Sequence, residues 1–437
     1  MIRINVNTPT TPAAILDQYQ SGPEVSFTLE TPFSKPRPEI FLFEQDVSNS
    51  DPANTAKRAG IRRVRRIHEG YPSHARTASL AGTVPSVGSI TGNFQNESPL
   101  HPAAAEFLND AFARGWADPS KIHQDSRKTA LLLNEAKELI SGHLRIRMDQ
   151  LTFLADPSLG YHLGISGMIN SVTKLYYGAT DRSEVFAIAN SNDAQVLPSD
   201  LNGYINYPSA RINDLLAWQS INGETGIIAR PPLDFSGKVF ADCTVDPGLN
   251  PLPTNWSSAL WDSRSWQGPA GLGVFALADP SSWRNPMPHN DNSISTTSFS
   301  VPLAIASAVA LDHFLKDFER DQISLQARNA KIRNFLLTEI GDVDIAGSLH
   351  QTVPHLLSFS ILYTDAQLLV NELDSSGFSV DSGSACSSAN MEPSHVLAAM
   401  GILTHGNIRM TLRAEQTEAT VDKFLQELKY LVERVRA

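Results

Sequence analysis

The chain has 437 residues and a formal net charge of −11, because 46 Asp and Glu outnumber 35 Lys and Arg. This length suits two or three packed domains and is ample for an enzyme, and the acidic balance argues against a general binder of nucleic-acid backbones. With 41% hydrophobic and 19% charged residues, the composition excludes a collagen, a coiled coil and a wholly disordered chain.

The expected location of the chain follows from what its sequence lacks. No run of residues approaches the roughly 18 to 20 apolar positions of a membrane span, and the first residues do not form a basic-then-apolar secretory signal. The two cysteines, Cys243 and Cys386, are too few for a disulfide scaffold, which favours a reducing interior. We therefore expect a cytoplasmic protein without a membrane segment.

The first ninety residues differ in kind from the rest of the chain. They carry ten Lys or Arg and eight Asp or Glu, a net of +2, so the remaining residues carry a net of −13. Recurring prolines argue against long helices there. The segment Lys57–Arg66 places six basic residues in ten, a pattern that can contact RNA, an acidic partner or the acidic body of this chain. We favour the interpretation that Lys57–Arg66 docks on the acidic body of the chain. We expect nucleic-acid binding only through this segment.

A small, Gly-rich stretch, Ala78–Gly92, has the composition of a linker. From Ser98 onward, helix-like stretches alternate with short apolar runs that turn-forming residues bound. In Lys128–Ile140 the apolar residues share one helical stripe, and Gly142 follows as an expected stop. The predicted strands are Val185–Ala189, Val239–Ala241 and Leu272–Leu277. This alternation predicts an α/β domain.

The last part of the chain predicts a smaller α+β domain. Its expected elements are helices at Val301–Phe318 and Ile323–Ile340, a half-buried strand at Leu357–Tyr363, a helix at Gln367–Leu373 and an amphipathic helix at Val421–Val435. We therefore divide the chain into an N-terminal extension at 1–90, a large domain at 91–311 and a small C-terminal domain at 312–437.

Five short motifs occur in the same order as in one known family. They are Asp118-Pro119-Ser120 with His123, Asn222-Gly223-Glu224-Thr225-Gly226, Phe240-Ala241-Asp242, Gly268-Pro269-Ala270-Gly271-Leu272-Gly273, and Asp381–Ala389 with Asn407-Ile408-Arg409. The set resembles the cysteine desulfurases of the class V aminotransferase group over about residues 93 to 437. The resemblance implies a fold-type I α/β architecture with a mostly parallel sheet, a homodimer, and a pocket for pyridoxal phosphate. The first ninety residues have no counterpart in it.

The resemblance also assigns roles to individual residues. Asp242 matches the carboxylate that pairs with the pyridine nitrogen of pyridoxal phosphate, and Asn222 begins the family's Asn-Asn-Glu-Thr-Gly turn. Arg409 matches the residue whose planar guanidinium binds the substrate carboxylate, and its alternative is a strand-edge salt bridge. Cys386 matches the thiol that carries substrate sulfur as a persulfide, and its alternative is a small buried hydrophobe.

The same alignment places substitutions where the cofactor chemistry would occur. Ser265 stands in place of the lysine that forms the imine, and a serine cannot form one. The phosphate-binding turn falls on Leu154–Leu159, which introduces a carboxylate and a proline and leaves Ser158 as its phosphate-competent hydroxyl. Asn192-Asp193 falls on the histidine that stacks on the ring, and Val245 falls on a glutamine.

The loss of a cofactor would leave Asp242 in need of a cation, and Arg264 is the expected partner. No cofactor is expected, and pyridoxal phosphate is possible only without a covalent bond. The twelve histidines form no metal-spaced set, so no metal is expected either.

Three hypotheses remain open. The first, which we favour, is a pseudoenzyme or sulfur-relay protein in which Cys386 accepts a persulfide. The second is an active class V enzyme, a desulfurase or C–S lyase, with noncovalent pyridoxal phosphate or changed chemistry. The third is a dimeric scaffold in which the basic segment carries the function. The expected partners are a second copy of the chain and a sulfur acceptor or another protein.

Overall fold

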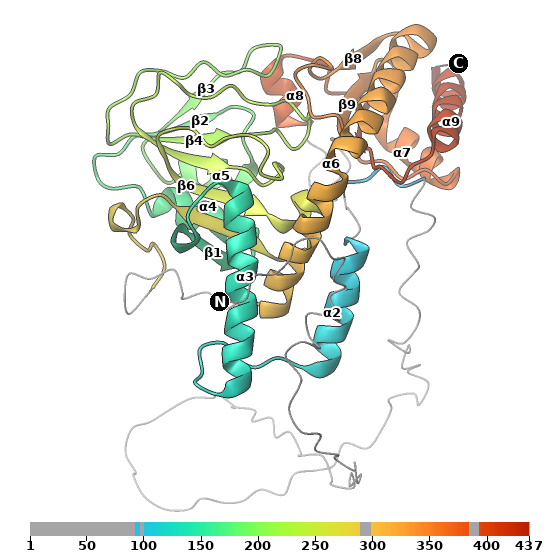
Figure 1. Ribbon diagram of the computed structural model, residues 1–437. Coiled ribbons are helices and arrows are strands. Elements are labelled where there is room, and N and C mark those ends of the chain that lie inside the picture. The colour runs from blue at the N-terminus through green and yellow to red at the C-terminus, as the bar shows by residue number, and fades with distance from the viewer. Residues whose placement is uncertain (1–91, 97–99, 289–298, 384–392, 437) are drawn as a thin grey trace, which may run out of the picture. The chain divides into compact units, whose positions relative to one another are not determined.

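The computed structural model describes residues 92–96, 100–288, 299–383 and 393–436 (Figure 1). Two features singled out in the sequence, the basic segment Lys57–Arg66 and Cys386, lie outside these ranges. The described residues contain a larger and a smaller β-sheet. A single long helix packs against the apolar cores of both.

A seven-stranded sheet forms the centre of the larger part. Its strands are β1 (Leu151–Leu154), β2 (Leu175–Gly178), β3 (Ala194–Leu197), β4 (Leu215–Gln219), β5 (Lys238–Asp242), β6 (Trp256–Asp262) and β7 (Gly273–Leu277). Their order is β1-β7-β6-β5-β4-β2-β3, and β7 runs antiparallel to both of its neighbours while the other pairs are parallel. The sheet confirms the expected α/β fold. The carboxyl ends of its parallel strands meet at one edge, where ligand sites form in such sheets.

Each face of this sheet has its own apolar layer. The covering helices are α2 (Pro102–Arg114), α3 (Gln124–Leu144), α4 (Pro157–Tyr161), α5 (Ser183–Ala189) and α6 (Val301–Phe335). In β5, Val239 and Ala241 point to the layer of α2, α3 and the start of α6, and Phe240 points to the layer of α4 and α5. Strands buried on both faces read as continuous apolar runs, which is why β4 is almost wholly apolar.

The expectation of a strand at Val185–Ala189 is wrong, because these residues belong to helix α5. A short apolar run does not by itself distinguish a buried strand from a buried helix, and Val185, Ile188 and Ala189 have the spacing of one helical face. The strand of this region is β2, which lies just before α5. The expected stop at Gly142 is also wrong, since α3 continues to Leu144 and ends at Arg145 in the left-handed conformation.

Helix α6 is one helix of 35 residues where the sequence predicted two. Its middle is polar and has neither Gly nor Pro, so nothing interrupts the backbone. The apolar pattern lapses there because the first half packs on the seven-stranded sheet and the end packs on the smaller core. None of the helices within the described ranges combines the length and apolarity that a membrane span needs.

The smaller sheet is antiparallel, with the strand order β10-β9-β8. Its elements are β8 (Val343–Ile345), β9 (Leu356–Ile361), α7 (Ala366–Ser375), α8 (His395–Met400), β10 (Asn407–Thr411) and α9 (Glu418–Arg436). The predicted half-buried strand is buried throughout as β9. Its polar face can be buried because Asn407 donates to the hydroxyls of Ser358 (3.1 Å) and Ser360 (3.2 Å).

Residues 92–96 pack with the C-terminal part. The Phe94 ring is fully buried, with its centroid 4.9 Å from that of Phe424. Arg413 donates to the carbonyls of Asn93 (2.7 Å) and Gln95 (2.8 Å). The predicted boundary between the large and the small domain, near residue 311, falls inside helix α6. The division into two domains, one around each sheet, stays a proposal.

Candidate functional site

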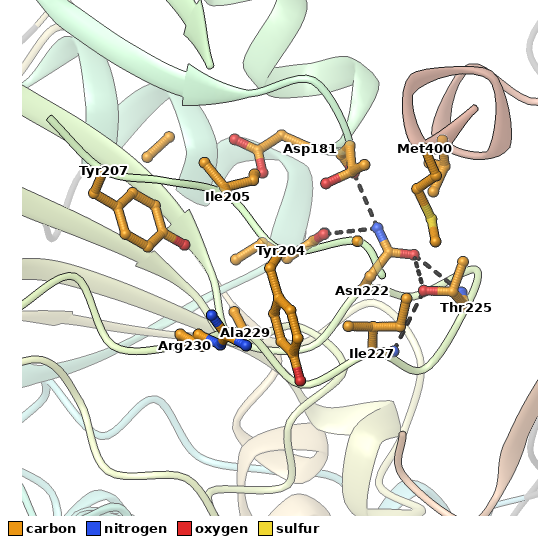
Figure 2. A pocket seen from close by; sticks show the side chains of 15 residues that line it. Asp181, Tyr204, Ile205, Tyr207, Asn222, Thr225, Ile227, Ala229, Arg230 and Met400 are labelled. Carbon is orange, nitrogen blue, oxygen red and sulfur yellow. Dashed lines mark hydrogen bonds between the residues drawn. The ribbon is translucent and has the colours of Figure 1, made fainter. Parts of the chain in front are cut away.

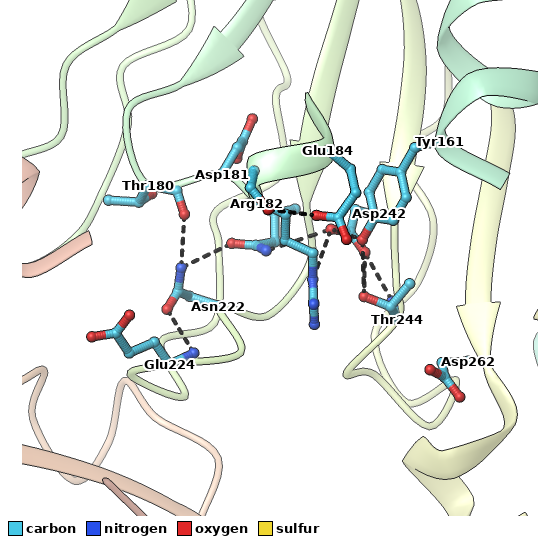
Figure 3. Close-up of polar contacts among 12 residues, drawn as sticks. Tyr161, Thr180, Asp181, Arg182, Glu184, Asn222, Glu224, Asp242, Thr244 and Asp262 are labelled. Carbon is cyan, nitrogen blue, oxygen red and sulfur yellow. Dashed lines mark hydrogen bonds and ion pairs between the residues drawn. The ribbon is translucent and has the colours of Figure 1, made fainter. Parts of the chain in front are cut away.

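Asp242 ends β5 at the carboxyl edge of the sheet and is 3% exposed. Tyr161 Oη donates to its Oδ2 over 2.9 Å, and the backbone N–H and hydroxyl of Thr244 donate to its Oδ1 over 3.0 and 2.6 Å (Figure 3). Burial and the nearby Asp242 charge raise the pKa of Tyr161 well above its usual value, so Tyr161 remains a neutral donor.

The cation beside Asp242 is Arg182, which precedes α5. Its Nε lies 3.6 Å from Asp242 Oδ2, and in Figure 3 its side chain extends between Asn222 and Thr244 into the space that Asp262 borders. Burial alone would lower the pKa of Arg182, but the neighbouring carboxylates, Asp242 first among them, raise it overall. The guanidinium therefore stays charged.

Arg264 was the expected partner of Asp242, and that expectation is wrong. Arg264 lies in the turn Ser263–Trp266 after β6 and binds Asp262, with Nη2 2.7 Å and Nε 3.0 Å from its Oδ2. The turn itself forms because the Asp262 carboxylate accepts the backbone N–H of Arg264 over 2.9 Å. Asp242 and Asp262 thus each have an arginine of their own.

Arg182 is a residue that the sequence reasoning missed. The apolar run at Val185–Ala189 predicts a strand, and this places the family's ring-stacking position, which follows that strand, at Asn192-Asp193. In the structure Asn192 follows α5 and donates back to the carbonyl of Ile188 over 2.7 Å. The available signal was the apolar run of β2, which is followed within a few residues by Arg182.

Asn222 and Ser265 use their polar atoms within the protein. The Asn222 amide donates to the carbonyl of Thr180 and to Gln219 Oε1, both over 2.9 Å, and its Oδ1 accepts the backbone N–H of Glu224 and of Thr225. It thereby fixes the predicted turn. Ser265 Oγ donates to the carbonyl of Asp262 over 2.8 Å.

The stretch expected to be the phosphate-binding turn is occupied by its own carboxylate. Asp156 precedes the short helix α4, and its Oδ1 accepts the backbone N–H of Ser158 over 2.8 Å. An anion at this turn would meet the Asp156 charge instead of a free N–H group. Ser158 is exposed here and lines neither of the cavities described next.

Two cavities meet at Arg264. The larger, of about 650 Å³, has Arg182, Asp262, Arg264 and Ser265 in its wall. The smaller, of about 310 Å³, has Glu224, Arg264, Asp381 and Arg409 in its wall. No lysine of the described residues lines either one. The structure therefore brings Ser265 and Arg409, from different domains of the predicted division, to one continuous region.

Arg409 lies on β10 and has both a salt bridge and a backbone role. Its Nη1 is 3.7 Å from Glu224 Oε2, and its Nη2 donates to the carbonyl of Ser382 over 2.8 Å. Its backbone exchanges two hydrogen bonds with Asp381, of 2.8 and 3.0 Å. These contacts hold the Arg409 guanidinium at Ser382, four residues before Cys386 in the sequence.

A third, much smaller cavity lies beside Asp181, next to Arg182 in sequence. It measures about 20 Å³, and Tyr207, Asn222 and Met400 are among its lining residues (Figure 2). Asp181 is 3% exposed, and its Oδ2 accepts the backbone N–H of Gly178 over 2.8 Å. Burial, opposed by that hydrogen bond and helped by the Asp242 charge, raises the pKa of Asp181 to about 8.

These residues do not fit pyridoxal phosphate. The carboxylate that would pair with the pyridine nitrogen already has a guanidinium beside it. The expected phosphate turn carries a carboxylate on its first free N–H group. No lysine of the described residues reaches the cavity wall to form an imine.

Comparisons with known proteins agree with the motifs. The family described as aminotransferase class-V matches residues 289–424. A cysteine desulfurase IscS of Dictyoglomus turgidum is 24% identical over 376 residues, which cover 78% of this chain and 93% of that protein. A cysteine desulfurase of Nostoc sp. is 36% identical over 110 residues, or 24% of this chain and 28% of that protein.

Solved structures show the same fold. A NifS-like protein superposes with a TM-score of 0.69 at 17% identity, covering 79% of this chain and 100% of the other. A NifS-like protein from Rickettsia africae superposes with a TM-score of 0.67 at 16% identity, covering 78% of this chain and 99% of the other.

Proposed function

Because the chain belongs to the cysteine desulfurase group of class V aminotransferases, we propose that it has kept the family's body and lost pyridoxal-phosphate-dependent chemistry. One observation carries this proposal: no lysine of the described residues lines the cavity that holds Ser265. An imine requires a primary amine within bonding reach of the cofactor aldehyde, and a hydroxyl cannot replace it. The proposed protein is thus a pseudoenzyme or a sulfur relay.

The relay form of the proposal assigns the chemistry to Cys386. Its thiolate attacks the terminal sulfur of a persulfide on a donor cysteine, a new S–S bond forms at Cys386, and the donor's S–S bond breaks to release a thiolate. No outside oxidant or reductant is needed. Arg409 is held at Ser382, four residues before Cys386 in the sequence, and a cation that meets a thiol lowers the thiol pKa and raises the thiolate fraction.

The expected partners are a donor or acceptor of sulfane sulfur and a second copy of this chain. The second copy rests on the resemblance alone. A dimeric scaffold that uses Lys57–Arg66 as its contact is the alternative if neither cofactor nor thiol chemistry is found.

The first prediction is that no covalent pyridoxal phosphate adduct forms. The purified protein incubated with pyridoxal phosphate should show no absorption band of an internal imine. After borohydride reduction, mass spectrometry should find no pyridoxyl group on any of the eleven lysines. Ser265→Lys alone should not restore full activity, because Arg182 and Asp156 still oppose the ring and the phosphate. A pyridoxyl lysine in the native protein would overturn the proposal and favour an active enzyme.

The second prediction is that Cys386 is the reactive thiol. A thiol reagent should modify one site rapidly, and the reaction should persist well below the ordinary thiol pKa of about 8.5. Cys386→Ser should abolish the reaction. Cys243→Ser is the matched control and should leave it unchanged, because Cys243 is 2% exposed and burial raises its pKa well above the usual value. A slow reaction with ordinary pH dependence would leave only the scaffold hypothesis.

A further inference from the structure

The site around Asp242 poses a charge problem that the protein solves internally. A carboxylate that is 3% exposed cannot stay ionised at low cost without a nearby positive charge. In an ordinary member of the family the pyridinium of the cofactor would meet this carboxylate. Here its hydrogen bonds come from Tyr161, Thr244 and Gln219, which are neutral donors. Hydrogen bonds alone leave the net charge uncompensated.

Arg182 is the cation that compensates it. Its Nε lies 3.6 Å from Asp242 Oδ2, and it is the cation that forms an ion pair with Asp242 among the described residues. The guanidinium is planar and permanently charged, as a protonated ring would be. It also lies between Asn222 and Thr244 in Figure 3 and is part of the wall of the 650 Å³ cavity.

We propose that Arg182 is a built-in replacement for the cofactor cation: it supplies the charge to Asp242 and occupies its approach, so that the site is stable and closed without pyridoxal phosphate. The inference rests on the proposed loss of cofactor chemistry and adds a specificity-determining residue to it. Arg182 acts on Asp242 and not on a substrate.

Removal of the cation should therefore be more damaging than removal of the whole pair. Arg182→Met leaves a buried, unpaired carboxylate, and we expect it to lower the Tm by about 5 °C or more at pH 8. Asp242→Asn keeps the shape of the side chain without its charge, and Arg182→Met/Asp242→Asn should recover most of the loss. Arg147→Met is the control, because Arg147 pairs with Asp149 on the surface and both are largely exposed.

The pH dependence separates a charge role from a packing role. In Arg182→Met the charge of the buried, unpaired Asp242 carboxylate is removed at least cost when the carboxylate binds a proton. The Tm deficit of this variant should then shrink as pH falls from 8 to 5. Tyr161, Asp181, Glu184 and Asp262 also face this pair. All four remain in the double variant Arg182→Met/Asp242→Asn. If the Tm deficit of that variant does not depend on pH, the pH dependence seen in Arg182→Met comes from Asp242.

Chemical rescue tests the same idea if Arg182→Met does not fold at pH 8. Compared with the wild-type arginine, the alanine of Arg182→Ala lacks the atoms that make up an ethylguanidinium ion. The variant is prepared at pH 5. Ethylguanidinium at pH 8 should raise the Tm of this variant, and neutral ethylurea of the same shape should not. The inference is overturned if ethylurea rescues equally, or if Asp242→Asn fails to relieve the Arg182 variants. Neither outcome depends on the pyridoxyl mass spectrum, so this inference and the proposed function can fail separately.

Discussion

Asp181 and Arg182 are neighbours whose side chains have opposite electrostatic conditions. Arg182 forms an ion pair with Asp242. Asp181 is instead buried beside a cavity too small for more than about one water molecule. Tyr207 faces the same cavity, and burial followed by the Asp181 charge raises its pKa above the usual range. Asp181 therefore has one strong stabilising contact for its charge, the Gly178 N–H group, and a high cost of ionisation.

We expect Asp181 to make the protein less stable as pH rises from about 4 to 8. Its pKa is about 8 when folded and about 3.9 when unfolded. Below pH 4 both states bind the proton and the residue contributes nothing. Between the two values the folded state holds a proton that the unfolded state has released, so the free energy of unfolding falls with rising pH.

Asp181→Asn should remove this dependence, since the Asn oxygen still accepts the Gly178 N–H. Urea unfolding measured from pH 5 to 9 should give a flatter profile for Asp181→Asn than for wild type, with the variant more stable at pH 8. Asp149→Asn, on an exposed residue, serves as the control. Parallel profiles for Asp181→Asn and wild type would show that Asp181 is ionised in the folded state.

At the residue scale the sequence predicted the turns in which two site residues lie, and their roles toward a cofactor stay predictions. Asn222 lies in the turn that its motif predicted, and Ser265 lies in the turn after β6, with its hydroxyl held by the chain. Ion pairing was less predictable, because it depends on which side chains meet in space. Arg264 and Arg182 line the same cavity, and only the geometry assigns the first to Asp262 and the second to Asp242.

At the scale of elements, helix α6 holds the Ser265 turn in place. The Ser307 hydroxyl on α6 accepts from Ser263 Oγ over 2.8 Å and from Trp266 Nε1 over 3.1 Å. All three side chains are fully buried. One hydroxyl therefore satisfies both ends of the turn Ser263–Trp266, and it is a polar contact between the helix and the site edge.

Ser307→Ala should lower the free energy of unfolding by about 1–3 kcal/mol, because it leaves two buried donors without an acceptor. Denaturant titration measures this change. Ser375→Ala is the control, because Ser375 lies on helix α7 and is exposed, and it should change stability by no more than about 0.5 kcal/mol. A loss from Ser307→Ala as small as that of the control would mean that solvent or a rearranged turn satisfies the donors.

Elements were predictable from periodicity where they are long and one-sided. Helices α3 and α9 and strands β5 and β7 fall where the apolar spacing predicted them. The pattern failed at α5, which is too short for its period to be recognised, and at α6, whose polar middle crosses between two cores. Both errors arise because burial by a distant part of the chain decides what a local pattern means.

At the scale of the whole molecule, the motifs predicted the fold better than they predicted the chemistry. The order of five motifs was enough for a fold-type I architecture, since topology constrains where turns and strand ends occur. The charges of the site were not predictable in this way. Asp242, Asp262 and Glu224 each have a local arginine, and such pairs can change while the backbone does not.

The anchoring of Phe94 has a consequence for where this chain can be cut. A chain shortened to begin at residue 92 keeps the Phe94 ring against Phe424 and both bonds from Arg413. A chain that begins at residue 100 loses all of these and leaves a void the size of a ring in the C-terminal core. Only the first truncation separates the N-terminal extension from an intact body, so the few residues around Phe94 belong to the body that any dissection must preserve.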